Sequence, residues 1–136
     1  MITAVDSSVL LDIFSADAAF GPRSRVALES CGDAGRLICC EVVWAEVSAG
    51  FPDHATVDAA MARVGVEFEA MDEWCASAAG SAWRAYRSRG GSRTTMIADF
   101  LIGAHALTRA DRLLTRDRGF LSNFAGLTIL DPTSTQ

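Results

Sequence analysis

The chain has 136 residues, enough to bury the core of one domain, which we expect to span residues 1–136. Half of its residues are hydrophobic, which excludes a disordered chain, and no apolar run reaches the roughly 18 residues that cross a bilayer. The net charge of −5 argues against a surface that binds nucleic acid throughout, and all 12 basic residues are arginine.

Short apolar strands alternate with helical segments, the pattern of an α/β domain with a parallel sheet. In chain order we expect a strand at 2–5, a helix at 7–15, a helix after Gly21-Pro22, a strand at 37–39, helices at 41–51 and 55–64, a strand at 66–70, helices at 72–87 and 95–109, a strand at 112–115, a helical turn within 116–124 and a strand at 127–130. Proline suits a first helical turn, and Asp72 is a good helix cap.

Two carboxylates follow apolar strands. Asp6 comes directly after the first strand, and Asp117 lies just past the strand "RLLT". Ligands of open parallel sheets bind beyond the carboxyl ends of the strands, at the point where the strand order reverses. Asp6 therefore fits two roles, as the cap of the following helix or as part of a site.

Two further acids, Glu46 and Asp99, lie in strongly apolar helical segments. Each acid alone also has a structural interpretation as a cap, an ion-pair partner or a turn residue. If the four converge, their charges repel, and a divalent cation such as Mg²⁺ or Mn²⁺ offsets that repulsion. Carboxylates with such a metal indicate hydrolysis of a phosphodiester. The hydroxyl groups of Thr115, Ser7 and Ser8 fit either the orientation of a metal-bound water or the capping of a turn.

Basic charge is concentrated near the end of the chain. Eight arginines lie between residues 84 and 118 against three aspartates, a local charge of +5, while residues 1–83 carry −9. Arginine binds phosphate in a bidentate manner. The candidates for phosphate contact, each of which also fits a solvated helix end, are Arg84, Arg87, Arg89, Arg93, Arg116 and Arg118.

The cysteines and histidines predict no metal site of their own. Cys31, Cys39, Cys40 and Cys75 have no C-x-x-C spacing, so we expect buried, inert thiols. The two histidines, His54 and His105, stand alone, and we expect structural roles for both. No basic segment follows Met1, so we expect no signal peptide, no membrane partner and a location in the cytoplasm.

Four segments together resemble a PIN domain of the VapC toxin type: "AVDSSVLLDIF", "VVWAEVSAG", "IADFLIGAHAL" and "RLLTRDRGF". The resemblance covers nearly the whole chain. It implies a PIN-like, three-layer α/β/α fold with a five-stranded parallel sheet, and cleavage of RNA that depends on Mg²⁺ or Mn²⁺.

The same resemblance implies the roles of individual residues. Asp6, Glu46 and Asp99 match the principal metal ligands, and Asp117 matches an acid that supports a water or a second metal. Thr115 matches the threonine of the last segment. The resemblance also implies a homodimer and a VapB-type antitoxin partner. Trp44, Phe51, Trp74 and Trp83 are candidates for an apolar partner surface or for the core.

Two other interpretations remain open. A phosphotransfer domain with an aspartyl nucleophile would use an aspartate at a strand end, but it normally needs a lysine, and the chain has none. A catalytically silent domain that binds RNA or protein would be free to lose one of the acids, and all four are present. Neither G-x-G-x-x-G nor G-x-x-x-x-G-K-[ST] occurs, which argues against nucleotide-binding folds.

Overall fold

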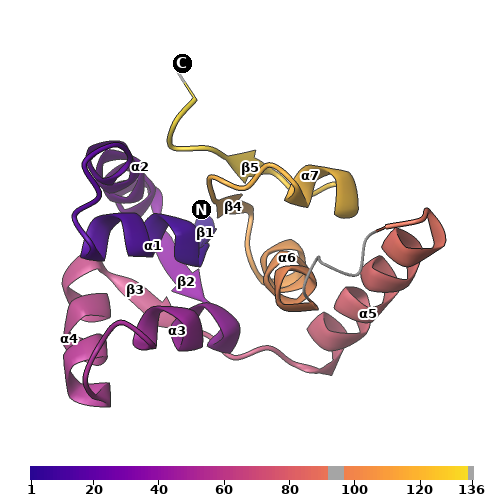
Figure 1. Cartoon of the computed structure of the whole chain (residues 1–136), viewed down its shortest axis with the longest axis horizontal. Coiled ribbons are helices and arrows are strands. Elements are labelled where there is room, and N and C mark those ends of the chain that lie inside the picture. Colours follow the sequence, from indigo (N-terminus) through magenta and orange to yellow (C-terminus); the bar gives the residue numbers. More distant parts are fainter. Residues whose placement is uncertain (92–96, 135–136) are drawn as a thin grey trace.

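The computed structural model describes residues 1–91 and 97–134, apart from the side chains at 121 and 122. Strands and helices alternate along the chain (Figure 1). The elements are β1 (Ile2–Val5), α1 (Ser7–Phe14), α2 (Gly21–Ala34), β2 (Arg36–Cys39), α3 (Glu41–Ser48), α4 (His54–Val64), β3 (Val66–Phe68), α5 (Glu73–Ser88), α6 (Ile97–Arg109), β4 (Arg112–Leu114), α7 (Phe120–Asn123) and β5 (Ile129–Leu130).

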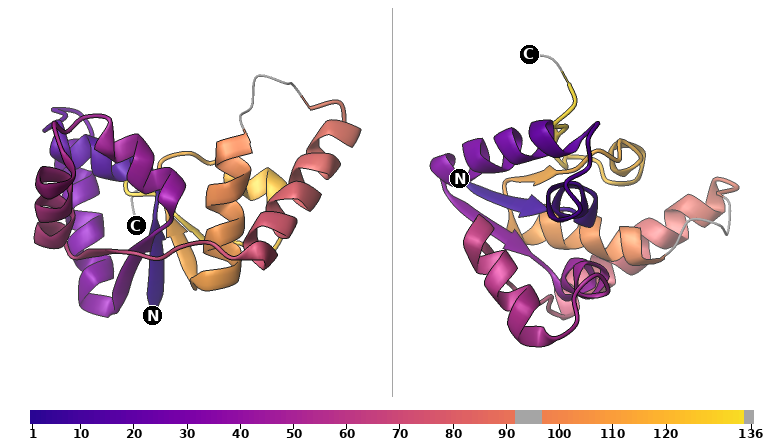
Figure 2. Two further views of the ribbon diagram at one scale, coloured as in Figure 1. Left: turned by 90° about the horizontal axis from the view of Figure 1, so that it is seen from below. Right: turned by 60° about the vertical axis from the view of Figure 1, so that its left-hand side comes forward.

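The strands form one parallel sheet in the order β3-β2-β1-β4-β5. Helices α2 and α6 lie on opposite sides of the strands (Figure 2), so the expected three-layer α/β/α arrangement with five parallel strands is confirmed. The chain leaves β1 toward β2 on one side and returns to β4 on the other. The strand order therefore reverses between β1 and β4, where Val5 lies opposite Leu114. The next residues, Asp6 and Thr115, emerge side by side at that point.

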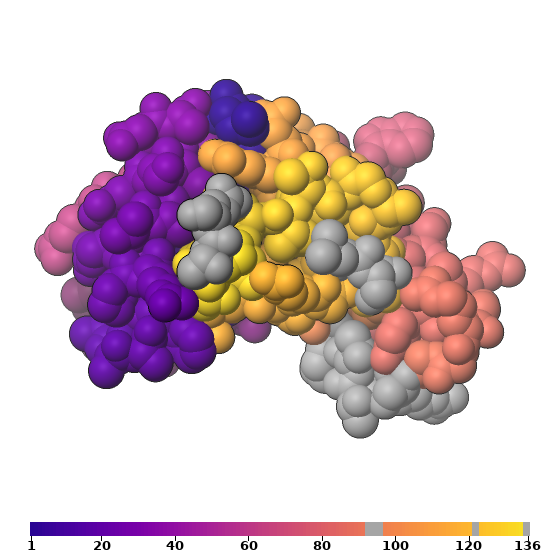
Figure 3. All heavy atoms as spheres, turned by 90° about the horizontal axis from the view of Figure 1, so that it is seen from above, coloured from indigo at the N-terminus to yellow at the C-terminus, as the bar shows by residue number. Residues whose placement is uncertain are grey.

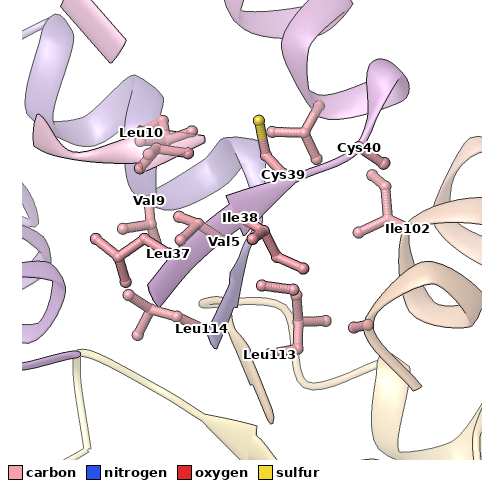
Figure 4. Packing of buried hydrophobic residues seen from close by; sticks show 14 of the residues in the cluster. Val5, Val9, Leu10, Leu37, Ile38, Cys39, Cys40, Ile102, Leu113 and Leu114 are labelled. Atoms are coloured by element: carbon pink, nitrogen blue, oxygen red, sulfur yellow. The ribbon is translucent and has the colours of Figure 1, made fainter. Parts of the chain in front are cut away.

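The core lies on both faces of the central strands. Val5, Ile38, Leu113 and Leu114 are at most 1 % exposed, because strands covered by helices on both sides bury every side chain. Figure 4 shows Val9 of α1 beside Leu37 on one side of the strands, and Leu113 toward Ile102 of α6 on the other. The ends of β1 and β4 are thus held rigidly by packing.

Most element boundaries follow the sequence, and the largest difference is at the end of α3. A helix to residue 51 is wrong, because α3 ends at Ser48. Phe51 precedes Pro52, and the ring of a proline disfavours helical geometry in the residue before it. The last strand begins at Ile129, since Gly126 adopts a positive φ of 86° in the preceding turn. Asp72 caps α5 as expected, accepting a hydrogen bond from the amide of Cys75.

The expected burial of the four cysteines is confirmed, and all four are free thiols. His105 is buried, and its Nε2 lies 2.9 Å from the carbonyl oxygen of Glu69. His54 begins α4 near the ring of Trp44. Within the described ranges, the helices are too short or too polar to cross a membrane.

Candidate functional site

Asp6 combines the two roles that its position predicts. Its Oδ1 accepts a hydrogen bond from the amide of Ser7 at 2.8 Å, which caps α1. Its Oδ2 accepts hydrogen bonds from the hydroxyls of Thr115 at 2.6 Å and Ser8 at 3.0 Å. Burial raises the pKa of the Asp6 carboxyl above its ordinary value although these hydrogen bonds lower it, and the charge of Asp117 raises it further. Asp6 is therefore a buried carboxylate with polar neighbours.

Thr115 connects two of the predicted acids. Its hydroxyl donates to Asp6 and accepts from the amide of Asp117 at 2.9 Å. Oδ1 of Asp117 accepts from the amide of Gly119 at 2.8 Å. Thr115 is completely buried, whereas Asp117 is exposed. The threonine therefore orients Asp6 and Asp117 from the interior of the molecule.

Glu46 and Asp99 approach the same place from two other helices. The hydroxyl of Ser7 lies 3.2 Å from Oε1 of Glu46 and 3.5 Å from Oδ1 of Asp6, so it bridges the two acids. Desolvation raises the pKa of Glu46, and the charges of Asp6 and Asp99 add to this effect. Desolvation also raises the pKa of Asp99, with further contributions from Asp117 and Asp6. The structure thus links the four acids electrostatically, with Glu46 coupled to Asp6 and Asp99, and with Asp117 coupled to the same two aspartates.

The donor chemistry of these acids fits a hard divalent cation. The ion pairs of the described residues involve other carboxylates and leave the four acids without a guanidinium partner. As the side chains stand, no three histidine, cysteine or acidic side chains in the described part are close enough together to hold a metal ion. Mg²⁺ needs only one or two carboxylates as direct ligands and keeps several waters. Acids that are too far apart to bind the ion as a group of three are therefore compatible with such a site.

Asp99 and Asp117 also line a cavity of about 290 Å³ between α5, α6 and α7. Its other walls include Tyr86, Asn123 and phenylalanine rings. The C-terminal end of α5 projects from the body of the molecule beside this region (Figure 3). Sequence reasoning did not identify Tyr86 or Asn123, because neither residue belongs to the segments that contain the acids.

Two of the predicted phosphate contacts are engaged in ion pairs. Arg116 binds Asp12 through two hydrogen bonds of 2.7 and 2.9 Å, and its guanidinium lies 4.1 Å from the ring centre of Phe20. Arg118 pairs with Asp131 at 2.8 Å. Neither guanidinium is aimed at the acids, and contact of these two arginines with RNA stays a prediction.

The other predicted arginines lie on or after α5. Arg84 and Arg87 are exposed on that helix, beside Trp83. Arg89 donates a hydrogen bond of 3.1 Å to Oδ1 of Asn123 at the rim of the cavity. Arg93 lies outside the described residues.

Asp12 is a structural residue that the sequence analysis missed. It is 5 % exposed and accepts hydrogen bonds from Arg116 and, at 2.8 Å, from the hydroxyl of Ser24. Its position between Leu11 and Ile13 in an apolar helix was the available signal.

Of the aromatic residues considered for a partner surface, Trp74 is 74 % exposed. Trp44, Phe51 and Trp83 are half-buried and pack against the core. The exposed apolar surface that these four residues provide is therefore mostly Trp74.

Solved structures of three toxin–antitoxin proteins share this fold. VapBC2 from Rickettsia felis, bound to a DNA fragment from its promoter, is 17% identical at a TM-score of 0.74, over 96% of this chain and 98% of the other. VapBC-1 from nontypeable Haemophilus influenzae is 18% identical at a TM-score of 0.74, over 98% and 100%. VapC20 from Mycobacterium tuberculosis, a toxin that cleaves the sarcin-ricin loop, is 17% identical at 0.59, over 93% and 98%.

Identities this low establish the shared fold, and no curated protein matches the chain in sequence. The family is established by a model of the PIN domain, which matches residues 3–126. That match includes all four acids and Thr115. The chain therefore belongs to the PIN domain family.

Proposed function

We propose that this chain is a metal-dependent endoribonuclease and the toxin of a toxin–antitoxin pair. The observation that carries the proposal is the group of four acids at the reversal of strand order, where burial and the charges of the acids raise the pKa values of Asp6, Glu46 and Asp99, and where the acids have no guanidinium partner among the described residues. Repelling charges brought together at a partly buried site destabilise a fold unless a ligand compensates for them. A divalent cation would supply that compensation, and it would also attract the phosphate of an RNA.

In this proposal Asp6, Glu46 and Asp99 would bind Mg²⁺ or Mn²⁺, one or two of them directly and the others through its waters, and Asp117 would support it from the exposed side. Such a cation, when bound, polarises a phosphoryl oxygen and stabilises the charge that develops on the leaving oxygen. The chain itself positions the acids through the buried hydroxyls of Thr115 and Ser7.

The nucleophile in the proposed reaction is water. Asp117 is exposed and held by Thr115 and Gly119, so it can accept a hydrogen bond from a water that approaches the phosphorus. Attack by water, rather than by the ribose 2′-hydroxyl, leaves a 5′-phosphate and a 3′-hydroxyl. The chemistry of the product ends therefore tests the mechanism.

Cleavage of a defined RNA by the purified chain tests this function. We expect cleavage with Mg²⁺ or Mn²⁺, loss of cleavage with EDTA, and loss in Asp6→Asn. Asp58→Asn, an exposed aspartate of α4, is the matched control and keeps full activity. Cleavage that survives both EDTA and Asp6→Asn contradicts the proposal, as do products that end in a 2′,3′-cyclic phosphate.

The partners are proposed from the same comparisons. VapBC complexes share the fold, so we propose a VapB-type antitoxin, a homodimer of one PIN-like domain per chain over residues 1–136, and action in the cytoplasm on an RNA substrate. Expression of the chain alone should arrest growth, and co-expression of a small reading frame immediately upstream should restore it. Light scattering on the purified protein measures the oligomeric state.

The phosphotransfer alternative lacks a required group. Such a domain normally needs a lysine beside the phosphoryl group, and the chain contains no lysine. A catalytically silent binding module would show no EDTA-sensitive cleavage of RNA, whereas our proposal predicts such cleavage.

A further inference from the structure

The cavity between α5, α6 and α7 adjoins the acids without being part of the carboxylate group. Asp99 and Asp117 form one side of it, and the remaining walls include Tyr86, Asn123 and phenylalanine rings, which no step above uses. At about 290 Å³ it is larger than one aromatic side chain requires. Because Asp99 and Asp117 belong to both places, a chemical group joined to a phosphate at the acids would reach this cavity.

Aromatic rings line one wall of the cavity. The buried rings of Phe100 and Phe124 have centres 6.1 Å apart, and the half-buried ring of Tyr86 lies 5.4 Å from that of Phe100. Gly103 makes this packing possible, since a Cβ there would lie 2.3 Å from the ring of Phe124. Contact with Phe100 holds the rings of Tyr86 and Phe124 in place, and an apolar wall suits a flat ligand.

The rim of the cavity is polar. The side-chain amide of Asn123 accepts a hydrogen bond from Arg89 at 3.1 Å and donates one to the carbonyl oxygen of Gly119 at 3.4 Å. A primary amide has two N–H groups and two lone pairs, so one donor and one acceptor of Asn123 remain for a ligand. Asn123 thus links α5 to α7 and still offers a hydrogen-bonding edge.

We propose that this cavity, the base pocket, binds the nucleobase of a nucleotide next to the cleaved phosphate. The base lies against the ring of Tyr86, and its polar edge hydrogen-bonds to Asn123. Proteins that recognise single-stranded RNA by sequence use this combination of a stacking ring and a hydrogen-bonding side chain. The inference rests on the proposed nuclease function and names the part of the site that selects the sequence.

A nucleobase fits this surface better than an acidic side chain, which Asp99 and Asp117 would repel. A guanidinium from a protein partner is the main competitor, since carboxylates and an aromatic ring attract it. The two occupants differ in what they require of the RNA. Only a nucleobase makes the base sequence of the cleaved RNA depend on Tyr86 and Asn123.

Cleavage of a pool of short single-stranded RNAs with random sequence tests the base pocket. We expect the wild type to prefer one base at a fixed position beside the cut. Tyr86→Leu and Asn123→Ala should reduce that preference about tenfold, the size of one stacking contact. Tyr86→Phe keeps the ring and should keep most of the preference. Phe68→Leu removes an exposed ring on β3, outside the pocket, and is the control.

A preference that is the same in Tyr86→Leu and the wild type overturns the base pocket, as does a wild type that cuts without any preference. Circular dichroism and thermal unfolding of each variant exclude loss of fold as the cause. If the wild type cleaves no RNA at all, the nuclease function is contradicted. A binding measurement that does not depend on cleavage then tests the base pocket.

That measurement uses the single tyrosine of the chain. Incorporation of 3-fluorotyrosine gives one ¹⁹F resonance, from Tyr86. In an Asp6→Asn background, a trinucleotide RNA with Mg²⁺ should shift this resonance, while an abasic trinucleotide of the same length should not. Equal shifts with both RNAs, or no shift with either, overturn the proposal.

Discussion

Two buried aspartates near α1 have opposite surroundings. Asp6 and Asp12 are each 5 % exposed, and both accept hydrogen bonds from hydroxyl groups. Asp12 also binds Arg116 in a bidentate ion pair, whereas Asp6 has no guanidinium partner within residues 1–91 and 97–134 and is subject to the charge of Asp117. A buried charge is tolerated when it is paired, so Asp12 is complete within the chain. Asp6 requires something from outside.

The contrast separates stability from function within one small region. Arg116 and Asp117 are adjacent in sequence, yet Arg116 is directed toward Asp12 and Asp117 toward the acids. The ion pair fixes the segment after β4 against α1, and Thr115 then determines where Asp117 lies. Removal of Asp6 should therefore affect activity, and removal of Arg116 should affect folding.

The largest expected effect is on catalysis. Asp6→Asn keeps the shape of the cap but removes the charge that the proposed cation needs. We expect cleavage to fall on the order of 10³-fold, because charge stabilisation by a metal supplies several kcal/mol of the barrier reduction. Single-turnover cleavage measures the rate, and Asp58→Asn is the control. A loss below tenfold, with the fold intact, would contradict a role of Asp6 at the metal.

The next effect is on stability. Arg116→Met leaves Asp12 buried without its partner, which should lower the free energy of unfolding by about 3 kcal/mol. Arg36→Met breaks an ion pair with Glu67 in which both side chains are more than half exposed, and it should lower the free energy of unfolding much less. Urea unfolding compares the two variants. Equal losses in both would show that the pair of Arg116 and Asp12 does not anchor the loop.

The sequence predicts what depends on residue type and local pattern, and it leaves open what depends on distant partners. The four acids are recognisable because each interrupts or ends an apolar segment, and the sheet is recognisable from its apolar strands. The pairing of Asp12 with Arg116 joins residues 104 positions apart, so Arg116 alone suggested contact with phosphate and Asp12 was given no role. The contact of Arg89 with Asn123, which brings α5 and α7 together, was not predicted either, because these residues are also far apart in the sequence. Only the packed structure shows which charges are already neutralised.

The pH dependence of stability should reveal the three acids of raised pKa in the metal-free protein. The raised pKa values of Asp6, Glu46 and Asp99 mean that the folded state binds protons more tightly than the unfolded state. Stability from these groups is therefore present at low pH and is lost as the pH rises through their folded pKa values. Asp72 contributes in the opposite sense because its pKa is lowered.

A difference measurement isolates the acids from the rest of the chain. Asp72 is present in both the wild type and Glu46→Gln, so its contribution cancels between them. We expect Glu46→Gln to lose less stability than the wild type as the pH rises above about 4, the ordinary range of a carboxyl group. Thermal unfolding in EDTA at several pH values gives the two curves. Parallel curves would mean that Glu46 titrates alike in both states.

The smallest expected effect is a gain in stability. Asp99→Asn removes a charge that Asp117 and Asp6 repel, and it should stabilise the metal-free protein by up to about 1 kcal/mol, since the site is partly solvated. The gain is limited because an acid in the first turn of α6 also interacts favourably with the helix dipole. With Mn²⁺ the order should reverse, because the wild type binds the cation more tightly and binding stabilises the folded state. A lower melting temperature of Asp99→Asn in EDTA would show that the repulsion among the acids is weaker than the helix dipole, and the contrast between Asp6 and Asp12 would lose its energetic basis.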